Sequence, residues 1–239
     1  MRAAWVFALL GCTSSLASGS VEETTHHRLP VAAAPTVIVD NDGGAVEVQP
    51  GKDGAVEVEA RRRAASRDEA LALPVSVEVD RDGQVARIRF HEEHHTEGHN
   101  VSFVIHAPAG ARLQVSTGGG AITTRRMGAQ TLRSGGGAIT ALEGDGTVEA
   151  RTGGGSVEIS GRLRGPSRVT TGGGSVRVAI PGDSRLRVDA STGGGSAQSD
   201  FGLAVEGRGA RHMSGTLGDG GEGSLELRTG GGSLNLTRL

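Results

Sequence analysis

The segment Thr152-Gly153-Gly154-Gly155-Ser156 is one of six copies of a motif in which a threonine or serine precedes three glycines. The copies begin at Thr117, Ser134, Thr152, Thr171, Thr192 and Thr229, so successive steps are 17, 18, 19, 21 and 37 residues. The last step is close to two periods, which indicates that one copy is degenerate or replaced by a loop. A period of about 20 residues is typical of proteins that stack one supersecondary unit on the next.

Each unit predicts two half-buried strands. The residues two before the motif and five after its first residue are apolar or small in every copy, and polar residues stand between them and their outer apolar neighbours. These positions are Val115, Leu132, Ala150, Val169, Ala190 and Leu227 before it, and Ile122, Ile139, Val157, Val176, Ala197 and Leu234 after it. Alternation of this kind indicates strands with one buried face. Because the two positions are an odd number of residues apart, the glycines must hold a bulge or corner that resets the alternation.

Glycine allows a positive φ and a close approach of one backbone to the next. We therefore predict structural corners, with positive φ and tight stacking of each triplet on its neighbours, at every glycine of the motif. These are Gly118, Gly119, Gly120, Gly135, Gly136, Gly137, Gly153, Gly154, Gly155, Gly172, Gly173, Gly174, Gly193, Gly194, Gly195, Gly230, Gly231 and Gly232. The hydroxyl that precedes each triplet is expected to bond along the stack. The predicted fold is all-β: a single-stranded, parallel, right-handed β-solenoid with units of about 18–20 residues.

Residues 1–19 have the pattern of an export signal, with Arg2 before an apolar run over residues 3–10. Two endings remain open. Leu9-Leu10-Gly11-Cys12 resembles a lipobox, which would make Cys12 the lipidated first residue, whereas Ser15-Leu16-Ala17 resembles an ordinary cleavage site. We expect an exported protein that is periplasmic, anchored to the outer membrane or extracellular, with a lipid anchor as its one contact with a membrane. Cys12 is the sole cysteine, so no disulfide is expected.

Residues 20–35 contain Pro30 and Pro35 and predict a linker. An N-terminal β region over 36–106 follows and is expected to cap the stack; the glycine-rich repeats occupy 107–239. Within the β region, alternation and turn residues predict strands at 36–40, 45–49, 55–60, 75–80, 85–90 and 101–106. Between residues 61 and 74 the alternation lapses. Ser66 and Glu69 there could form the capping box of a short helix, and an ordered loop is the alternative.

Composition excludes several functions. The formal net charge is −2 and, beyond residue 20, the only aromatic residues are Phe90, Phe103 and Phe201, so no nucleic-acid partner is expected. The glycine motif lacks the aspartate that calcium-binding repeats of similar period carry, and we expect no cofactor. A protein or surface ligand is expected but is not identified by the sequence. The chain is expected to be a monomer or to associate edge to edge.

The segment His91-Glu92-Glu93-His94-His95 matches the H-E-x-x-H pattern, and His99 follows. That pattern binds zinc when helical spacing places both imidazoles on one face. Here it continues a predicted strand and enters a turn, which favours a solvated polar loop or weak metal binding. We therefore predict neither a metal site nor catalytic residues, and His91, His95 and His99 are the residues that would form a metal site if one existed.

The chain resembles the bacterial putative-adhesin domain family of unknown function. The resemblance covers 36–239 and rests on the order of three elements: the opening Thr36-Val-Ile-Val-Asp-Asn-Asp-Gly-Gly-Ala-Val-Glu-Val48, the entry Ala107-Pro108 through Gly120, and the close Leu225-Glu-Leu-Arg-Thr-Gly-Gly-Gly-Ser-Leu-Asn-Leu236. Members look like a signal or anchor followed by one adhesin-like, glycine-rich domain without defined catalytic residues. The resemblance implies a β-solenoid. The unbroken triple glycine departs from the commoner single glycine and suggests tighter corners.

These observations predict a non-enzymatic, exported protein whose β-solenoid gives an interaction or structural surface in the cell envelope. Two alternatives remain. One is an envelope enzyme, either a hydrolase with a metal centre at residues 91–99 or a carbohydrate-active solenoid, and the other is a scaffold or partner of envelope-stress signalling.

Overall fold

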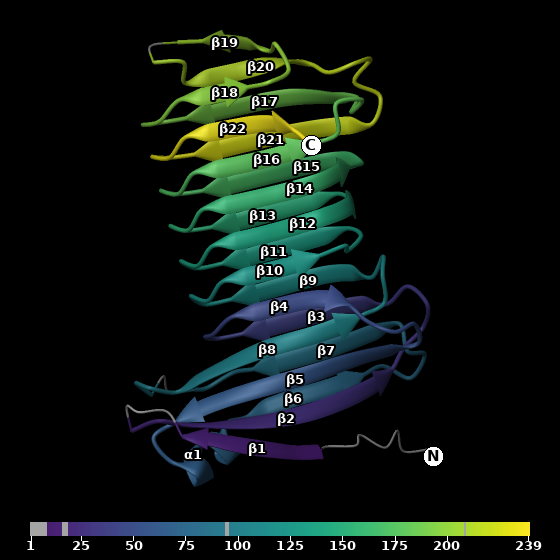
Figure 1. Ribbon diagram of the computed structural model, residues 1–239, viewed down its shortest axis with the longest axis vertical. Helices are drawn as coiled ribbons and strands as arrows, with labels where there is room; N and C mark the ends of the chain where they lie inside the picture. Colours follow the sequence, from purple (N-terminus) through teal and green to yellow (C-terminus); the bar gives the residue numbers. More distant parts are fainter. Residues whose placement is uncertain (1–8, 16–18, 94–95, 208) are drawn as a thin grey trace.

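The computed structural model describes residues 9–15, 19–93, 96–207 and 209–239, and it consists of two open sheets that run along the long axis of the molecule (Figure 1). Each sheet has eleven strands. In spatial order, sheet A contains β1 (Leu9–Ser15), β2 (Val21–Pro30), β5 (Ala55–Ala64), β8 (Asn100–Ala107), β4 (Val46–Pro50), β10 (Ile122–Arg125), β12 (Ile139–Gly146), β14 (Val157–Leu163), β16 (Val176–Ile180), β22 (Leu234–Arg238) and β18 (Ala197–Ser199). Sheet B contains β19 (Ala204–Glu206), β20 (His212–Thr216), β17 (Leu186–Thr192), β21 (Gly223–Thr229), β15 (Gly165–Thr171), β13 (Val148–Thr152), β11 (Gln130–Ser134), β9 (Arg112–Thr117), β3 (Thr36–Asn41), β7 (Val85–Phe90) and β6 (Val75–Val79).

Each repeat unit places one strand in each sheet. Strand β13 ends at Thr152, the triplet 153–155 follows, and the chain then continues as β14 in the other sheet. Neighbouring units pair in parallel and in register, so that Val157 lies beside Ile139 on one side and Val176 on the other. These apolar side chains, like Ala150 in sheet B, are buried between the sheets. The observed burial follows the alternation in the sequence, and the predicted all-β fold is confirmed.

The expectation of a purely parallel stack is wrong at both ends of the molecule. Strands β2 and β5, β5 and β8, and β6 and β7 pair antiparallel at the N-terminal end, and β1 adds to the edge in the same way. At the other end β20 pairs antiparallel with both β17 and β19. Both sheets are therefore mixed. Tight turns such as that at 80–83, between β6 and β7, connect antiparallel strands, whereas parallel neighbours require a longer crossover.

The order of the units in space differs from their order in the chain at both ends. Strands β3 and β4 lie between the pair β7/β8 and the pair β9/β10. Likewise β21 and β22, the last strands of the chain, lie between β15/β16 and β17/β18 (Figure 1). This arrangement explains the long step from Thr192 to Thr229. The chain first forms β17 and β18 and then the β19–β20 hairpin. It then returns to form β21 and β22, which lie between β15/β16 and β17/β18.

The N-terminal region contains all six strands expected within 36–106, each within a few residues of its predicted bounds. The short segment between β5 and β6 is a helix, α1 (Arg67–Ala72), and the Ser66 side chain accepts a hydrogen bond from the backbone N–H of Glu69 (3.3 Å). The linker predicted at 20–35 is wrong over 21–30. These residues form β2, which pairs with β5 along its whole length. The alternation of apolar and polar residues did not reveal this strand because glutamate and threonine occupy most of its buried face.

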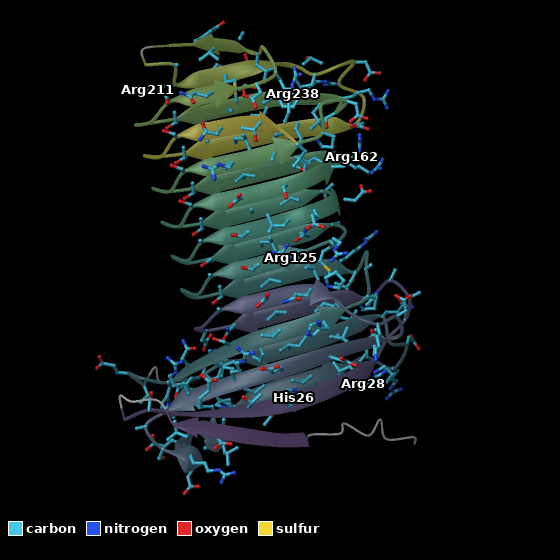
Figure 2. All side chains as sticks on the ribbon, viewed as in Figure 1. His26, Arg28, Arg125, Arg162, Arg211 and Arg238 are labelled. Atoms are coloured by element: carbon cyan, nitrogen blue, oxygen red, sulfur yellow. The ribbon has the colours of Figure 1, made fainter. Side chains whose placement is uncertain are left out.

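The edge opposite the glycine triplets is formed by longer connections that carry charged side chains. Arg125 and Arg162 lie toward this edge (Figure 2). Ion pairs join one connection to the next, as between Arg164 and Asp145 and between Arg162 and both Asp183 and Glu222. We call the segments 125–130, 143–147, 161–165, 181–185 and 218–222 the charged edge, and the six triplets the glycine edge. Within the described ranges, no helix has the length and apolar character that crossing a membrane would require.

Candidate functional site

The glycine edge consists of closely stacked backbone. A Cβ atom on Gly153 would collide with the carbonyl oxygen of Gly135, and one on Gly155 with that of Gly137. A Cβ on Gly154 would meet nothing within 4 Å. The same pattern of two closed outer positions and an open middle one holds at residues 118–120 and 135–137. Close approach therefore requires glycine at the first and third positions of a triplet. The expectation that the middle position also excludes a side chain is wrong in these three triplets, whereas a Cβ on Gly194 would lie 3.3 Å from the carbonyl oxygen of Gly231.

The positive φ predicted for the triplets is also wrong. None of the eighteen triplet glycines has φ in the left-handed region. The corner instead uses backbone angles open to other residues, and glycine is required because the preceding unit lies so near. Left-handed glycines occur elsewhere, for example at Gly44 and Gly146.

The hydroxyl before each triplet bonds along the stack, but its partner is backbone and not another hydroxyl. The Thr152 hydroxyl donates to the carbonyl oxygen of Gly137 in the preceding unit (2.8 Å) and accepts from the backbone N–H of Gly155 (3.3 Å). Equivalent bonds to the neighbouring unit occur at Thr117, Ser134, Thr171, Thr192 and Thr229. Asn41 occupies this position in the β3–β4 unit and donates to the carbonyl oxygen of Val101 in the neighbouring unit (2.9 Å) and to that of Gly44 in its own (3.2 Å). These residues join neighbouring units of the stack.

The histidines of the H-E-x-x-H segment have separate partners. His91 is exposed, and its Nδ1 lies 2.8 Å from an oxygen of Asp42. His99 is largely buried, and its Nδ1 lies 2.6 Å from Glu92 Oε1. Burial raises the pKa of Glu92, but its hydrogen bonds with His99 and Thr96 outweigh this effect, so the pKa is lowered overall. His95 lies outside the described residues. Among the residues that the structure does place, no three potential metal ligands come together. Cys12, the lipidation candidate, lies in β1.

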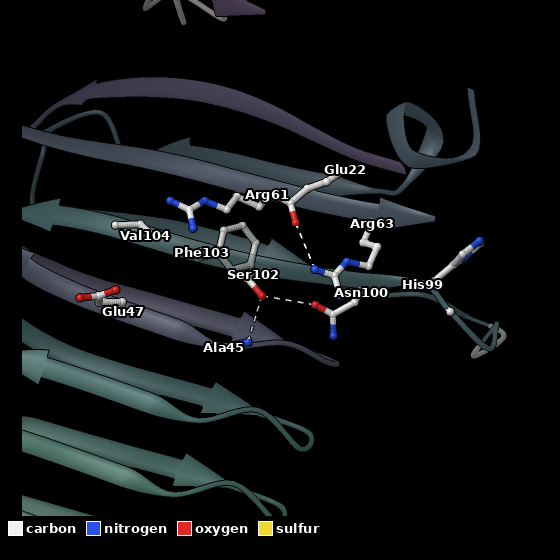
Figure 3. A pocket seen from close by; sticks show the side chains of 11 residues that line it. Glu22, Ala45, Glu47, Arg61, Arg63, His99, Asn100, Ser102, Phe103 and Val104 are labelled. Atoms are coloured by element: carbon white, nitrogen blue, oxygen red, sulfur yellow. Dashed lines mark hydrogen bonds and ion pairs between the residues drawn. The ribbon is translucent and has the colours of Figure 1, made fainter. Parts of the chain in front are cut away.

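A depression lies on the outer face of sheet A near the N-terminal end, over β5, β8 and β4 (Figure 3). It is open to solvent and has a volume of about 680 Å³. Alternation along the strands brings Glu22, Arg61, Arg63 and Ser102 to this face. The Ser102 hydroxyl accepts from the backbone N–H of Ala45 (3.2 Å) and donates to Asn100 Oδ1 (3.3 Å). Arg63 pairs with Glu22 (3.3 Å).

The charges in this depression compensate one another. Arg61 bonds to Glu59 (2.6 Å), and this hydrogen bond raises the pKa of the arginine. Both arginine side chains remain about half exposed and keep further N–H groups free for a ligand. The depression can therefore bind polar or charged groups. It presents no pairing of a nucleophile with a base among its lining residues.

Sequence reasoning missed this depression. Glu22 fell in the predicted linker, and Arg61 and Arg63 fell where the alternation seemed to end. The signal was the alternation of charge itself, because Glu57, Glu59, Arg61 and Arg63 occupy every second position of one strand.

Neither a protein-family model nor a curated protein sequence matches the chain. Solved structures do match. A putative cell adhesion protein from Clostridium sporogenes is 14% identical over 90% of this chain and 100% of its own, with a TM-score of 0.54. Two putative adhesins, from Bacteroides fragilis and Parabacteroides distasonis, are 10% and 15% identical over 90% of this chain and 97% of theirs, with TM-scores of 0.36 and 0.35. The first similarity shows a shared fold, and the other two are too distant to add to it. The resemblance to the putative-adhesin family is thus confirmed at the level of fold.

Proposed function

We propose that this chain is a non-enzymatic, adhesin-like protein exported to the bacterial cell envelope, where it provides an interaction surface. One observation carries the proposal. The two open sheets, of eleven strands each, have polar outer faces, and their fold is shared with a protein named as a putative cell adhesion protein. Loops and faces on a rigid scaffold are common places for binding.

In this proposal the scaffold is a right-handed β-solenoid. Its support is the in-register parallel pairing of successive units from β9 and β10 to β16, together with the buried row between the sheets. Antiparallel strands close both ends. Closed ends are required in a stack because each unit is stabilised through its neighbours.

Export is supported by the charged and apolar pattern of residues 1–19. Removal of residues 1–17 would take away the whole of β1, which spans Leu9–Ser15, whereas removal of residues 1–11 would take away only its first three residues. The protein would then act in the periplasm, at the outer membrane or outside the cell.

The test is to express the full chain in a bacterium that does not aggregate and to follow settling of the culture and attachment to glass. Leu9→Arg/Leu10→Arg, which interrupts the apolar run, is the matched control that blocks export. We expect cells with the parent chain to aggregate or attach, and control cells to behave like the empty strain. Equal behaviour of both, with the parent chain shown to be processed, would contradict an adhesin-like role. An intact mass that retains Met1 would contradict export.

A further inference from the structure

Strand β2 is the second strand of sheet A, and among the described residues β1 is the strand that pairs with its outer side. The β1 residues Leu9, Leu10 and Gly11 pair with His26, Thr25 and Thr24, and Ser14 and Ser15 pair with Glu22 and Val21. Because β1 belongs to the proposed export signal, this inference rests on the proposed function. Cleavage after Ala17 would remove β1 and expose the ten-residue strand β2 along its length.

An exposed edge strand of this length presents unpaired N–H and C=O groups and readily accepts another strand. The position of β1 shows that an antiparallel strand fits against this edge without displacing β2 from β5. A replacement strand from another chain would complete the sheet by the same main-chain hydrogen bonds.

The sequence of β2 is complementary to itself in the antiparallel direction. When Thr25 is placed opposite Thr25 of a second copy, Val21 faces Leu29, Glu22 faces Arg28, Glu23 faces His27 and Thr24 faces His26. Directly opposed side chains of opposite charge stabilise a sheet, whereas like charges destabilise it. In this register every acidic residue of β2 meets a basic residue or histidine, and no like charges oppose one another.

The buried face of β2 supplies an independent observation. Arg62 Nη1 donates to the Thr25 hydroxyl (2.8 Å), and that hydroxyl lies 3.3 Å from His27 Nε2. If the hydroxyl donates to Nε2, the proton of neutral His27 sits on Nδ1. That nitrogen is buried and has no hydrogen-bond partner. Glu23 Oε1 is also buried without a hydrogen bond, although Arg67 Nε lies 3.1 Å away as an ion pair.

The buried Nδ1 of His27, which has no hydrogen-bond partner, and the buried Oε1 of Glu23, which has an ion pair but no hydrogen bond, therefore lie four residues apart on the same face of β2. Antiparallel pairing about Thr25 would place His27 of one copy opposite Glu23 of the second copy. The two-fold axis repeats the same pair on the other side of Thr25. A hydrogen bond between the imidazole N–H and the carboxylate would give each group the hydrogen-bond partner that it lacks within its own chain, which favours association.

We propose that the mature chain forms a two-fold symmetric dimer in which β2 pairs antiparallel with β2 of a second copy, centred on Thr25. Such an interface is isologous, because the same residues contribute from both subunits. It joins the two stacks at their N-terminal ends into one continuous sheet. The opposite ends, formed by β18 and the β19–β20 hairpin, then point away from each other.

The first test is the mass in solution of the chain purified after export from the bacterium that produces it. Intact mass establishes that the chain begins after residue 17, and light scattering on a sizing column gives the assembly mass. A processed chain should have twice the mass of one subunit. A processed chain that stays monomeric at micromolar concentration would overturn the dimer and leave the proposed function intact, whereas an unprocessed chain would overturn the premise of export that both share.

The second test reverses the outer-face charges. Glu22→Arg and Arg28→Glu each place like charges opposite one another and should weaken dimerisation at least tenfold. The combined variant restores opposite charges and should recover it. Each residue also has a partner within its own chain, Arg63 for Glu22 and Glu57 for Arg28. Arg61→Glu on the neighbouring strand is the matched control and should leave the assembly mass unchanged. Failure of the combined variant to recover dimers, with its thermal unfolding intact, would exclude this register.

The third test fixes the centre of the interface. Directly opposed residues of antiparallel strands have Cα atoms about 4.5–5.5 Å apart, which is within disulfide range. After removal of residue 12, Thr25→Cys would supply the sole cysteine of the mature chain. It should form a disulfide-linked dimer on mild oxidation, while Thr131→Cys, on the outer face of sheet B, should not. Equal cross-linking of both variants, or none at residue 25, would contradict pairing about Thr25.

Discussion

The two long edges of the molecule connect the strands of successive units in different ways. At the glycine edge, the chain passes from sheet B to sheet A through three glycines and one alanine or serine, and successive units contact through backbone and one hydroxyl. At the charged edge, the chain passes from sheet A to sheet B through connections of differing length, except at 218–222, which joins β20 and β21 of sheet B. Neighbouring connections there contact one another through arginine and carboxylate side chains. The connections at the glycine edge have the same length in every unit, whereas those at the charged edge differ from unit to unit.

This difference shows where the repeat period originates. The spacing from the hydroxyl residue to the first buried residue after the triplet is constant, because the stacked glycines leave no room for an insertion. The steps of 17, 18, 19 and 21 residues therefore reflect the charged edge, where solvent surrounds the connections. A backbone contact fixes geometry, whereas an exposed ion pair between long side chains tolerates change and contributes about 0–1 kcal/mol.

The largest effect is expected in the core beside the glycine edge. Val157 is 1% exposed and lies between Ile139 and Val176 of the adjacent units. Val157→Asp would bury an unpaired charge and should destabilise the fold by several kcal/mol, about 3 or more. Glu158→Lys, one residue later on the outer face, should change stability by no more than about 0.5 kcal/mol. Urea unfolding of both variants measures this, and similar midpoints would show that the alternation has been misassigned.

A smaller effect is expected within the glycine edge. Thr152→Val keeps the shape of the side chain but removes the donor to the carbonyl oxygen of Gly137 and the acceptor of the Gly155 N–H. Stability should fall by about 1–3 kcal/mol because both backbone groups lose a partner. Thr170→Val, on the outer face of β15, is the control and should stay within about 0.5 kcal/mol. A control variant as unstable as Thr152→Val would show that the bonded hydroxyl has no special role.

The smallest effect is expected at the charged edge. Arg162 bonds to both oxygens of Asp183 (2.8 and 3.0 Å) and lies 3.5 Å from Glu222. Arg162→Gln should lower stability by about 1 kcal/mol or less, and high salt should shrink the difference because it screens exposed charges. Unfolding at low and high salt provides the measurement. A larger loss of stability that persists in high salt would mean that the contacts at the charged edge stabilise the fold as much as those at the glycine edge.

The same contrast explains what the sequence could predict. The repeat of Thr, three glycines and flanking apolar residues predicted the strands of the central units, because burial and alternation coincide there. It did not predict that β21 and β22 insert between earlier units, since pairing between identical motifs gives no information about which copies are neighbours. Strand β2 was missed because Glu23 and Thr25 occupy its buried face.

The candidate site was less accessible to sequence reasoning. The depression on sheet A depends on Glu22 of β2 and Arg63 of β5 meeting across a pair of strands forty-one residues apart in the chain. The close stacking at the triplets was predicted from the cost of placing glycine in every unit; of the two reasons given for glycine, the close approach of neighbouring backbones holds and the positive φ is wrong. Steric exclusion by a neighbouring unit leaves the same sequence signature as a left-handed turn.

The most direct test of this account compares two glycines of a single triplet. Gly155→Ala would place a Cβ against the carbonyl oxygen of Gly137, whereas Gly154→Ala would place one in open space. Thermal melts of the two variants should differ strongly: we expect Gly155→Ala to lose several kcal/mol, about 2 or more, and Gly154→Ala to match the parent or exceed its stability by about 0.4–1 kcal/mol through reduced unfolded-state entropy. Equal melting temperatures for the two variants would contradict the claim that close backbone stacking holds the glycine edge together.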